Sequence, residues 1–131
     1  MYFQYTEVGV YKEPLDIWQN LNGTNFLELT YQDPERWGMT FESLVMLTMV
    51  EEHLANSLFS PGSYLPIKVM ERSVHSARAC FIENLKPILN NGEMEVLDSW
   101  YRLFTDQPAF DVDVDLVIYL QVRPNKEYFF K

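Results

Sequence analysis

Three short runs of β-forming residues, separated by segments of helical character, constrain the fold of this chain more than any other feature. The runs are Glu7–Tyr11, Ile67–Met70 and Leu116–Leu120. Apolar residues between them recur at steps of three and four, which is typical of amphipathic helices. Strands that alternate with helices indicate an α/β fold with a parallel sheet. The third run is continuously apolar, which favours a strand buried on both faces.

Four helices are expected between and after the first two runs. Their ranges are Asn25 to Tyr31, Thr40 to Ser57, Val74 to Leu85 and Met94 to Phe104. Thr24 is the expected N-cap of the first helix, because its hydroxyl can accept a backbone hydrogen bond. Asp33-Pro34 is expected to end that helix, and Ser60-Pro61-Gly62-Ser63 to form a loop. A further helix is expected to open near Asn125.

The composition limits the classes of protein to which this chain can belong. Its 131 residues make one domain at most, and a hydrophobic fraction of 47% allows a real core. The net charge of −9 argues against a nucleic-acid partner, since phosphates are neutralised by Lys and Arg. No apolar run approaches the roughly 18 residues of a membrane span. Met1 to Lys12 resembles neither a secretory signal nor a mitochondrial presequence. The lone Cys80 cannot form an internal disulfide and is expected to be a buried apolar residue.

Charged residues follow the first two runs. Pro14 disfavours helix at Glu13, which places Glu13 at the carboxyl end of the first strand. Glu71 and Arg72 follow the second strand. Because ligands of parallel sheets bind beyond the carboxyl ends of the strands, these charges are expected to converge on one crevice. Spacing alone leaves Glu13 open as either a solvated strand end or a catalytic carboxylate.

Other polar patterns carry less weight. Asp111, Asp113 and Asp115 alternate as metal ligands sometimes do, but no glycine turn or fourth ligand follows, which favours a polar strand entry. His53 and His75 have no paired-ligand spacing and are expected to be surface or capping residues.

Four ordered motifs resemble those of deoxynucleoside kinases. They are EPLDIW at 13–18, RWGMTFES at 36–43, MERSVHSAR at 70–78 and DVDLVIYL at 113–120, the last followed by Pro124. Their order and most of their spacings agree with the family over nearly the whole chain. The branch that includes thymidine kinase 2 and insect deoxynucleoside kinases is the most similar. The resemblance implies a P-loop kinase-like three-layer α/β fold with a parallel sheet.

The resemblance also implies an activity, the transfer of the ATP γ-phosphoryl, with Mg²⁺, to the 5′-hydroxyl of a deoxynucleoside. Glu13 would be the general base, and Arg72 would pair with it and stabilise charge near the transferred group. Tyr31 would hold the sugar 3′-hydroxyl. Arg78 stays open between a phosphate contact and a structural ion pair.

The base pocket that the resemblance implies is largely apolar. Its walls would be Trp18, Leu27, Phe41, Val45, Met49 and Phe81. Ala77 stands where deoxycytidine-type relatives carry Asp, which favours a pyrimidine substrate.

Glu42 departs from the family, which has a base-reading Gln at this position. A Gln side chain offers a donor and an acceptor together, whereas an ionised Glu offers acceptors only. An ionised Glu42 would repel O4 of thymine or N3 of cytosine, and would suit an edge with two donors, as in guanine. A Glu kept protonated by burial is the alternative. We therefore expect an altered base preference or reduced activity.

The phosphate-binding loop of the family, G-x-x-x-x-G-K-[ST], has no counterpart in the 131 residues, where no two glycines are five apart. Comparison with the family predicts this loop before Met1 and an Arg-rich lid after Lys131. The central strand that leads into the loop is then missing, so the strands Ile67–Met70 and Leu116–Leu120 are not expected to pair.

Residues 1–131 are accordingly expected to be a partial deoxynucleoside kinase domain, the nucleoside-binding portion. We expect it to bind neither ATP nor Mg²⁺, to be inactive alone and to be marginally stable. A sharp melt above about 50 °C would contradict that last expectation.

Two function hypotheses remain: an incompletely represented deoxynucleoside kinase, or a non-catalytic nucleoside-binding or protein-interaction relative. Retention of Glu13 and Arg72 favours the first, because a scaffold needs no base. The resemblance further implies a homodimer through the helices Thr40–Ser57 and Val74–Leu85, and an intracellular location in the cytoplasm or the mitochondrion.

Overall fold

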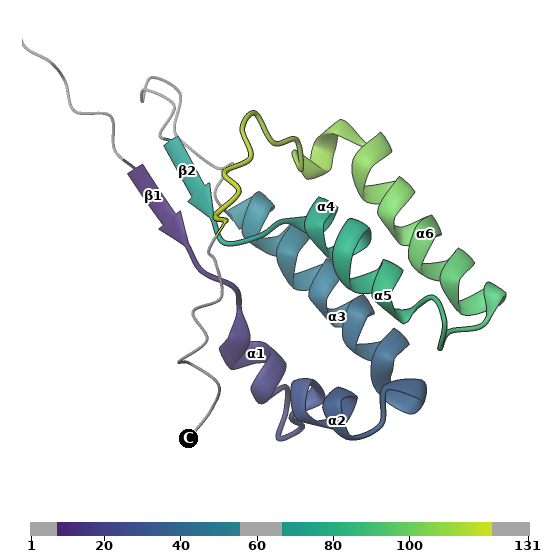
Figure 1. Cartoon of the computed structure of the whole chain (residues 1–131). Coiled ribbons are helices and arrows are strands. Elements are labelled where there is room, and N and C mark those ends of the chain that lie inside the picture. Colours follow the sequence, from purple (N-terminus) through teal and green to yellow (C-terminus); the bar gives the residue numbers. More distant parts are fainter. Residues whose placement is uncertain (1–7, 56–66, 122–131) are drawn as a thin grey trace, which may run out of the picture.

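A computed structural model describes residues 8–55 and 67–121 as a small sheet beside a layer of helices (Figure 1). The elements in chain order are β1 Val8–Tyr11, α1 Leu15–Gln19, α2 Phe26–Gln32, α3 Pro34–Ala55, β2 Ile67–Met70, α4 Val74–Ser76, the π-helix η1 Ala77–Ile82, α5 Glu83–Leu85, α6 Asn91–Asp106 and the 3₁₀ helix η2 Pro108–Phe110. The loop expected at 60–63 and the helix expected near Asn125 lie outside the described residues.

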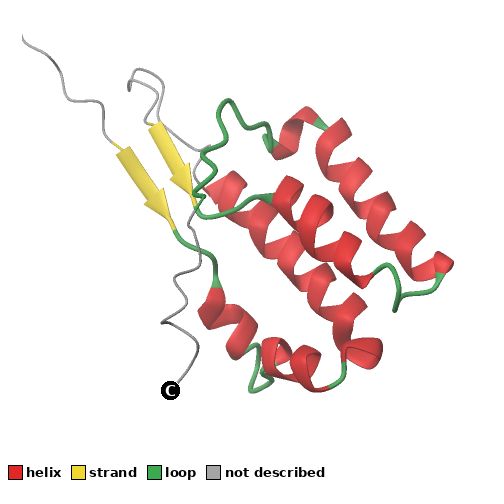
Figure 2. Ribbon diagram, viewed as in Figure 1, coloured by secondary structure: helices red, strands yellow, loops and turns green. Residues whose placement is uncertain are grey.

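The two strands confirm the parallel pairing that the sequence predicts. Val8 lies opposite Ile67, and Tyr11 lies opposite Met70. Within the described residues the sheet has these two strands, and Figure 2 shows it at one end of the helical layer. The carboxyl ends of both strands therefore lie side by side.

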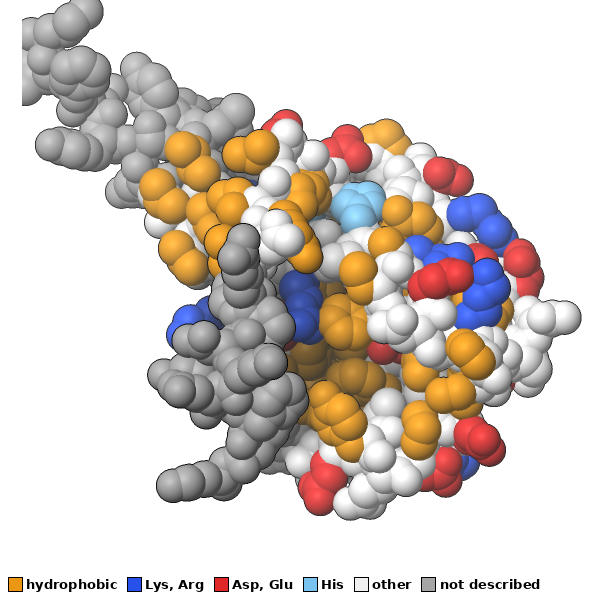
Figure 3. Space-filling model, viewed as in Figure 1, with side chains coloured by type: hydrophobic (Ala, Val, Ile, Leu, Met, Phe, Trp, Pro, Cys, Tyr) orange, Lys and Arg blue, Asp and Glu red, His pale blue; other side chains and the backbone are white. Residues whose placement is uncertain are grey.

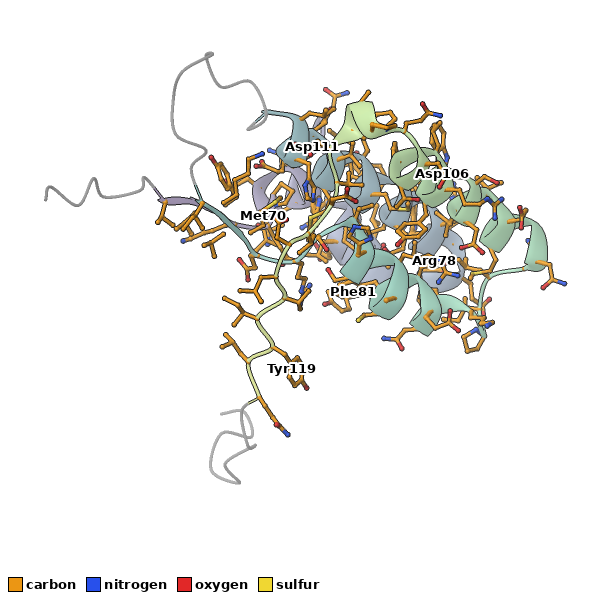
Figure 4. All side chains as sticks on the ribbon, turned by 90° about the horizontal axis from the view of Figure 1, so that it is seen from above. Met70, Arg78, Phe81, Asp106, Asp111 and Tyr119 are labelled. Carbon is orange, nitrogen blue, oxygen red and sulfur yellow. The ribbon has the colours of Figure 1, made fainter. Side chains whose placement is uncertain are left out.

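The prediction of a buried strand at Leu116–Leu120 is wrong. These residues are not assigned to a strand, and their side chains are 69–82% exposed. Figure 4 shows Tyr119 on an extended segment that runs away from the helices. An extended apolar segment needs neighbouring strands to accept its backbone groups before it can be buried, and this run pairs with neither β1 nor β2.

Helix α3 begins six residues earlier than expected. Pro34 occupies its first position, where a missing N–H costs nothing, and Asp33 Oδ1 accepts a hydrogen bond from the Arg36 N–H at 3.1 Å. Asp33-Pro34 therefore separates α2 from α3, as predicted, and also starts α3.

The N-cap of α2 is Asn25 instead of Thr24. Asn25 Oδ1 accepts a hydrogen bond from the Glu28 N–H at 3.0 Å, whereas the backbone of Thr24 pairs with Leu21. Asn22 and Gly23, with φ of 51° and 86°, make the turn between them, and this turn places Asn25 one residue before the helix.

The helix expected over Val74–Leu85 is present, with a π-helical middle at Ala77–Ile82. The expected Met94–Phe104 helix runs over Asn91–Asp106, starting from a capping box between Asn90 and Glu93. Both helices pack against α3, as Figure 1 shows.

The hydrophobic core lies between these three helical segments. Its least exposed large side chains are Met46 from α3, Val74 from α4, Ile82 from η1 and Leu97 from α6. The core fixes α3 and η1, from which most of the predicted pocket residues project. No described helix has both the length and the hydropathy of a membrane span.

Candidate functional site

Glu13 and Arg72 meet where the two strands end. The Glu71 N–H donates to the Tyr11 carbonyl at 2.8 Å, which continues the pairing one step beyond β2. Arg72 Nη1 then donates to Glu13 Oε1 at 2.7 Å. The structure thus brings together the two charges whose convergence the sequence predicts.

The surroundings of this ion pair are asymmetric. The Glu13 side chain is 8% exposed, whereas the Arg72 side chain is 48% exposed. Burial raises the pKa of the Glu13 carboxyl, and the charge and hydrogen bond of Arg72 partly oppose that rise. A carboxylate with a raised pKa accepts a proton more readily, so Glu13 has the environment of a general base.

Arg72 is held in an uncommon conformation. Its φ is 67°, in the left-handed region that non-glycine residues rarely adopt. Its guanidinium carbon lies 4.5 Å from the centroid of the Phe81 ring. The Arg72 guanidinium therefore contacts both the Glu13 carboxylate and the Phe81 ring.

An open hollow of about 340 Å³ lies along α1 and α2. Gln19, Asn25, Leu27, Glu28, Tyr31 and Gln32 line it. Tyr31 is 82% exposed, so its hydroxyl is accessible to a ligand and is not a core group. Sequence reasoning found Leu27 and Tyr31 but missed the polar side chains around them, because isolated Gln and Asn residues carry no motif.

The other predicted pocket walls form one cluster. Trp18, Phe41, Val45, Met49 and Ala77 are all buried in it, and Leu27 and Phe81 pack against it. The rings of Trp18 and Phe41 meet edge to face at 5.6 Å. Figure 3 shows a hollow near the strand end of the molecule, where a Lys or Arg side chain lies beside hydrophobic ones.

Thr48 is a member of this region that sequence reasoning missed. Its hydroxyl accepts a hydrogen bond from Trp18 Nε1 at 3.0 Å and donates to the Leu44 carbonyl at 2.9 Å. Thr48 is therefore the buried polar group that holds the Trp18 ring against α3. In the sequence, the signal that could have identified Thr48 is a threonine on the otherwise apolar face of a helix.

Glu42 lies on α3 next to Phe41 and is 4% exposed. Its Oε2 has no hydrogen-bond partner among the described residues. Burial raises the pKa of the Glu42 carboxyl to about 7. Near neutral pH a large share of this group is therefore the neutral acid, which offers a donor and an acceptor together.

Arg78 makes ion pairs in this structure. Its Nε donates to Asp98 Oδ1, and its Nη1 donates to Glu83 Oε2 at 3.2 Å. Figure 4 shows Arg78 on the α6 side of η1, consistent with the Asp98 contact. Of the two alternatives left open for Arg78, the structural ion pair is the one that these contacts support.

The two histidines and the cysteine have surroundings that differ from, or add to, the predictions. His53 is buried, not on the surface, because the end of α3 packs under the segment at Asp111. Cys80, which lies in the π-helix, is exposed and not buried. His75 joins two elements, since its ring nitrogens lie 2.8 Å from the Tyr101 hydroxyl and 2.9 Å from the Val112 carbonyl.

No group of three or more His, Cys, Asp or Glu side chains that could hold a metal ion occurs within 8–55 and 67–121. A metal site built from three or more of these side chains is therefore not found in these ranges. The triphosphate likewise has no glycine-rich loop among the 131 residues.

Comparison with known proteins identifies the family of the chain. A family model for deoxynucleoside kinase matches residues 2–128. Mitochondrial thymidine kinase 2 of Macaca fascicularis and of Homo sapiens are both 38% identical over 125 residues, which cover 94% of this chain and 44% of theirs. Human deoxycytidine kinase is 33% identical over 107 residues, covering 79% of this chain and 41% of its own.

The chain spans less than half the length of these relatives. The match nevertheless covers every described element, from β1 to the extended segment after η2. The small parallel sheet with its helical layer fits the P-loop kinase-like α/β fold of that family. The motifs, the fold and the matches together show that the chain belongs to the deoxynucleoside kinase family.

Proposed function

We propose that this chain is the nucleoside-binding part of a deoxynucleoside kinase, which transfers the ATP γ-phosphoryl to the 5′-hydroxyl of a deoxynucleoside. The observation that carries the proposal is the Glu13–Arg72 pair at the joint carboxyl ends of β1 and β2. Parallel α/β sheets bind their ligands at this edge.

Glu13 is the general base in this proposal. Arg72 engages its Oε1, so the second carboxylate oxygen is the candidate acceptor for the hydroxyl proton. Burial raises the pKa of Glu13, which makes it a stronger base, while Arg72 keeps enough of it ionised to act. The positive charge of Arg72 also offsets negative charge that develops near the transferred group.

ATP and Mg²⁺ enter the proposal from the family alone. ATP supplies the phosphoryl group in a kinase, but the 131 residues hold no glycine-rich phosphate loop, and the described residues hold no cluster of three or more metal-ligating side chains. The role assigned to this chain is therefore limited to binding the nucleoside, orienting its hydroxyl and accepting the proton.

The hollow along α1 and α2 is the proposed sugar site, with the exposed Tyr31 hydroxyl as partner for the 3′-hydroxyl. The cluster of Trp18, Phe41 and Phe81 is the proposed apolar wall for the base. Ala77, which is small and buried in the same cluster, stands where deoxycytidine-type relatives carry Asp, and this substitution supports a pyrimidine substrate.

Glu42 is the proposed determinant of base preference. Its neutral form presents the donor and acceptor pattern of a Gln, and its ionised form presents acceptors only. Because the pKa of Glu42 is about 7, pyrimidine binding is expected to weaken as the pH rises above neutrality.

An NMR titration of the 131-residue chain with each of the four deoxynucleosides tests the proposal. We expect signals of Leu27, Tyr31 and Phe81 to shift with at least one pyrimidine nucleoside. A chain whose signals do not move with any of the four would contradict the proposed function.

The variant Glu42→Gln separates base preference from binding itself. We expect it to bind thymidine more tightly than the unmodified chain above neutral pH, with little pH dependence. Equal affinity of the two chains for thymidine at every pH would remove Glu42 from the proposal and leave nucleoside binding intact.

We also propose a homodimer and an intracellular location in the cytoplasm or mitochondrion, both on the family resemblance. The thymidine kinase 2 relatives are described as mitochondrial. Sedimentation of the purified chain tests the dimer, which a monomer at high concentration would contradict.

A further inference from the structure

Hydrogen bonds hold the backbone on both sides of Arg72. On one side, the preceding Glu71 N–H donates to Tyr11 and ties the chain to β1. On the other, Ser73 caps α4, and its side chain and that of Ser76 bond each other's backbone N–H groups. Between these anchors Arg72 adopts its left-handed φ of 67°. Such a conformation persists only where its surroundings enforce it.

A clamped backbone does not by itself fix a long side chain. The Arg72 side chain is about half exposed, and an ion pair at such a position is weakened by water and by the entropy of the side chain. The bond to Glu13 at 2.7 Å therefore needs a second constraint to stay populated.

Phe81 provides a contact of the right kind. The guanidinium carbon of Arg72 lies 4.5 Å from the ring centroid, inside the roughly 6 Å range of cation–π attraction. The guanidinium lies over the Phe81 ring, whereas Glu13 accepts a hydrogen bond from Nη1. The two contacts act in different directions and together restrict the group.

The π-helix affects how Phe81 is positioned relative to Arg72. Phe81 lies in η1, where hydrogen bonds run to the fifth residue instead of the fourth. The wider turn changes the angle at which Phe81 leaves the helix relative to an α-helix continued from α4. Phe81 packs against the core cluster at the same time, which makes its ring a firm support.

We propose that Phe81 is a positioning residue, whose ring holds the guanidinium of Arg72 against Glu13. The consequence for phosphoryl transfer rests on the proposed function, but the positioning itself does not. It predicts that the ion pair weakens when the aromatic face is removed, even where the apolar volume is kept.

The test is NMR of the chain without any nucleoside, comparing the unmodified chain with Phe81→Leu and Phe81→Tyr. We expect a ring-current shift on the Arg72 side-chain signals, retained in Phe81→Tyr and lost in Phe81→Leu. The carboxyl titration of Glu13 should move further upward in Phe81→Leu, towards that of Arg72→Met, and stay in place in Phe81→Tyr.

A merely structural role for Phe81 would lower stability without moving the Glu13 titration of the folded protein. A folded Phe81→Leu variant with an unchanged Arg72 shift and Glu13 titration would overturn the proposal. Should Phe81→Leu not fold, absence of the ring-current shift on Arg72 in the unmodified chain would overturn it as well. Because no nucleoside is present, either outcome is separate from failure of the proposed function.

Discussion

At the scale of single residues, the buried carboxyl of Glu42 makes the stability of the protein depend on pH. The native state holds a proton on Glu42 up to a pH of about 7, whereas the unfolded chain releases it near 4.5. Between these values the native state binds more protons, so the contribution of Glu42 to the free energy of unfolding falls as the pH rises. The full rise in the pKa of Glu42 corresponds to roughly 3 kcal/mol in the free energy of unfolding.

Glu42→Gln should remove this dependence, because the amide does not titrate. His53 contributes with the opposite sign, since burial lowers its pKa and its stabilisation is lost as the pH falls. The difference between the two chains therefore isolates Glu42. Urea denaturation from about pH 5.5 to about pH 8 should show a stability gap that widens with pH. A constant gap would mean that Glu42 is ionised throughout.

Sequence reasoning at this scale succeeded where chain topology fixes a position. Glu13 and Arg72 follow parallel strands, so their meeting needed no knowledge of side-chain packing. It failed for Thr48 and for the Phe81 contact, which depend on rotamers and on a π-helical register. Nothing in the residue types around 77–82 indicates that the helix widens there.

At the scale of elements, the hydrogen bond from Trp18 to Thr48 joins α1 to α3. Thr48→Val keeps the shape of the side chain but leaves the buried indole N–H without an acceptor. We expect a loss of about 1–3 kcal/mol in the free energy of unfolding. Thr48→Ser, which keeps the hydroxyl, is the matched control and should lose less. Equal losses in the two variants would assign the effect to packing.

Helices were easier to predict than strands for a physical reason. A helix satisfies its own backbone, so hydrophobic periodicity located the helix at 94–104, although its start at the Asn90 cap was missed. A strand needs a neighbour, and the run at 116–120 shows that hydrophobicity alone does not supply one. The short β1 and β2 were found as runs of β-forming residues, and Pro14 helped to place the end of β1.

At the scale of the whole molecule, the sheet is the weakest part. Two strands of four residues are marginal by themselves, and one face of this sheet exposes Val8, Val10, Ile67 and Val69 by 41–69%. In Figure 3 hydrophobic side chains gather over this end of the molecule. The helical layer, in contrast, has a continuous core.

Hydrogen exchange should show this contrast. We expect the amides of β1 and β2 to exchange much faster than those at the centre of α3, because little buried surface opposes local opening of the strands. Protection of the strands equal to that of α3 would show that the sheet unfolds only with the whole molecule.

The central claim, that Glu13 and Arg72 receive the 5′-hydroxyl of a deoxynucleoside, has a direct test. Thymidine and 5′-deoxythymidine differ only in that hydroxyl, and their affinities for the chain and for Glu13→Ala can be measured near pH 6, where Glu42 is mostly neutral. A hydrogen bond to a charged group predicts about tenfold or more tighter binding of thymidine, a preference lost in Glu13→Ala. Equal binding of the two nucleosides to the unmodified chain would contradict the account.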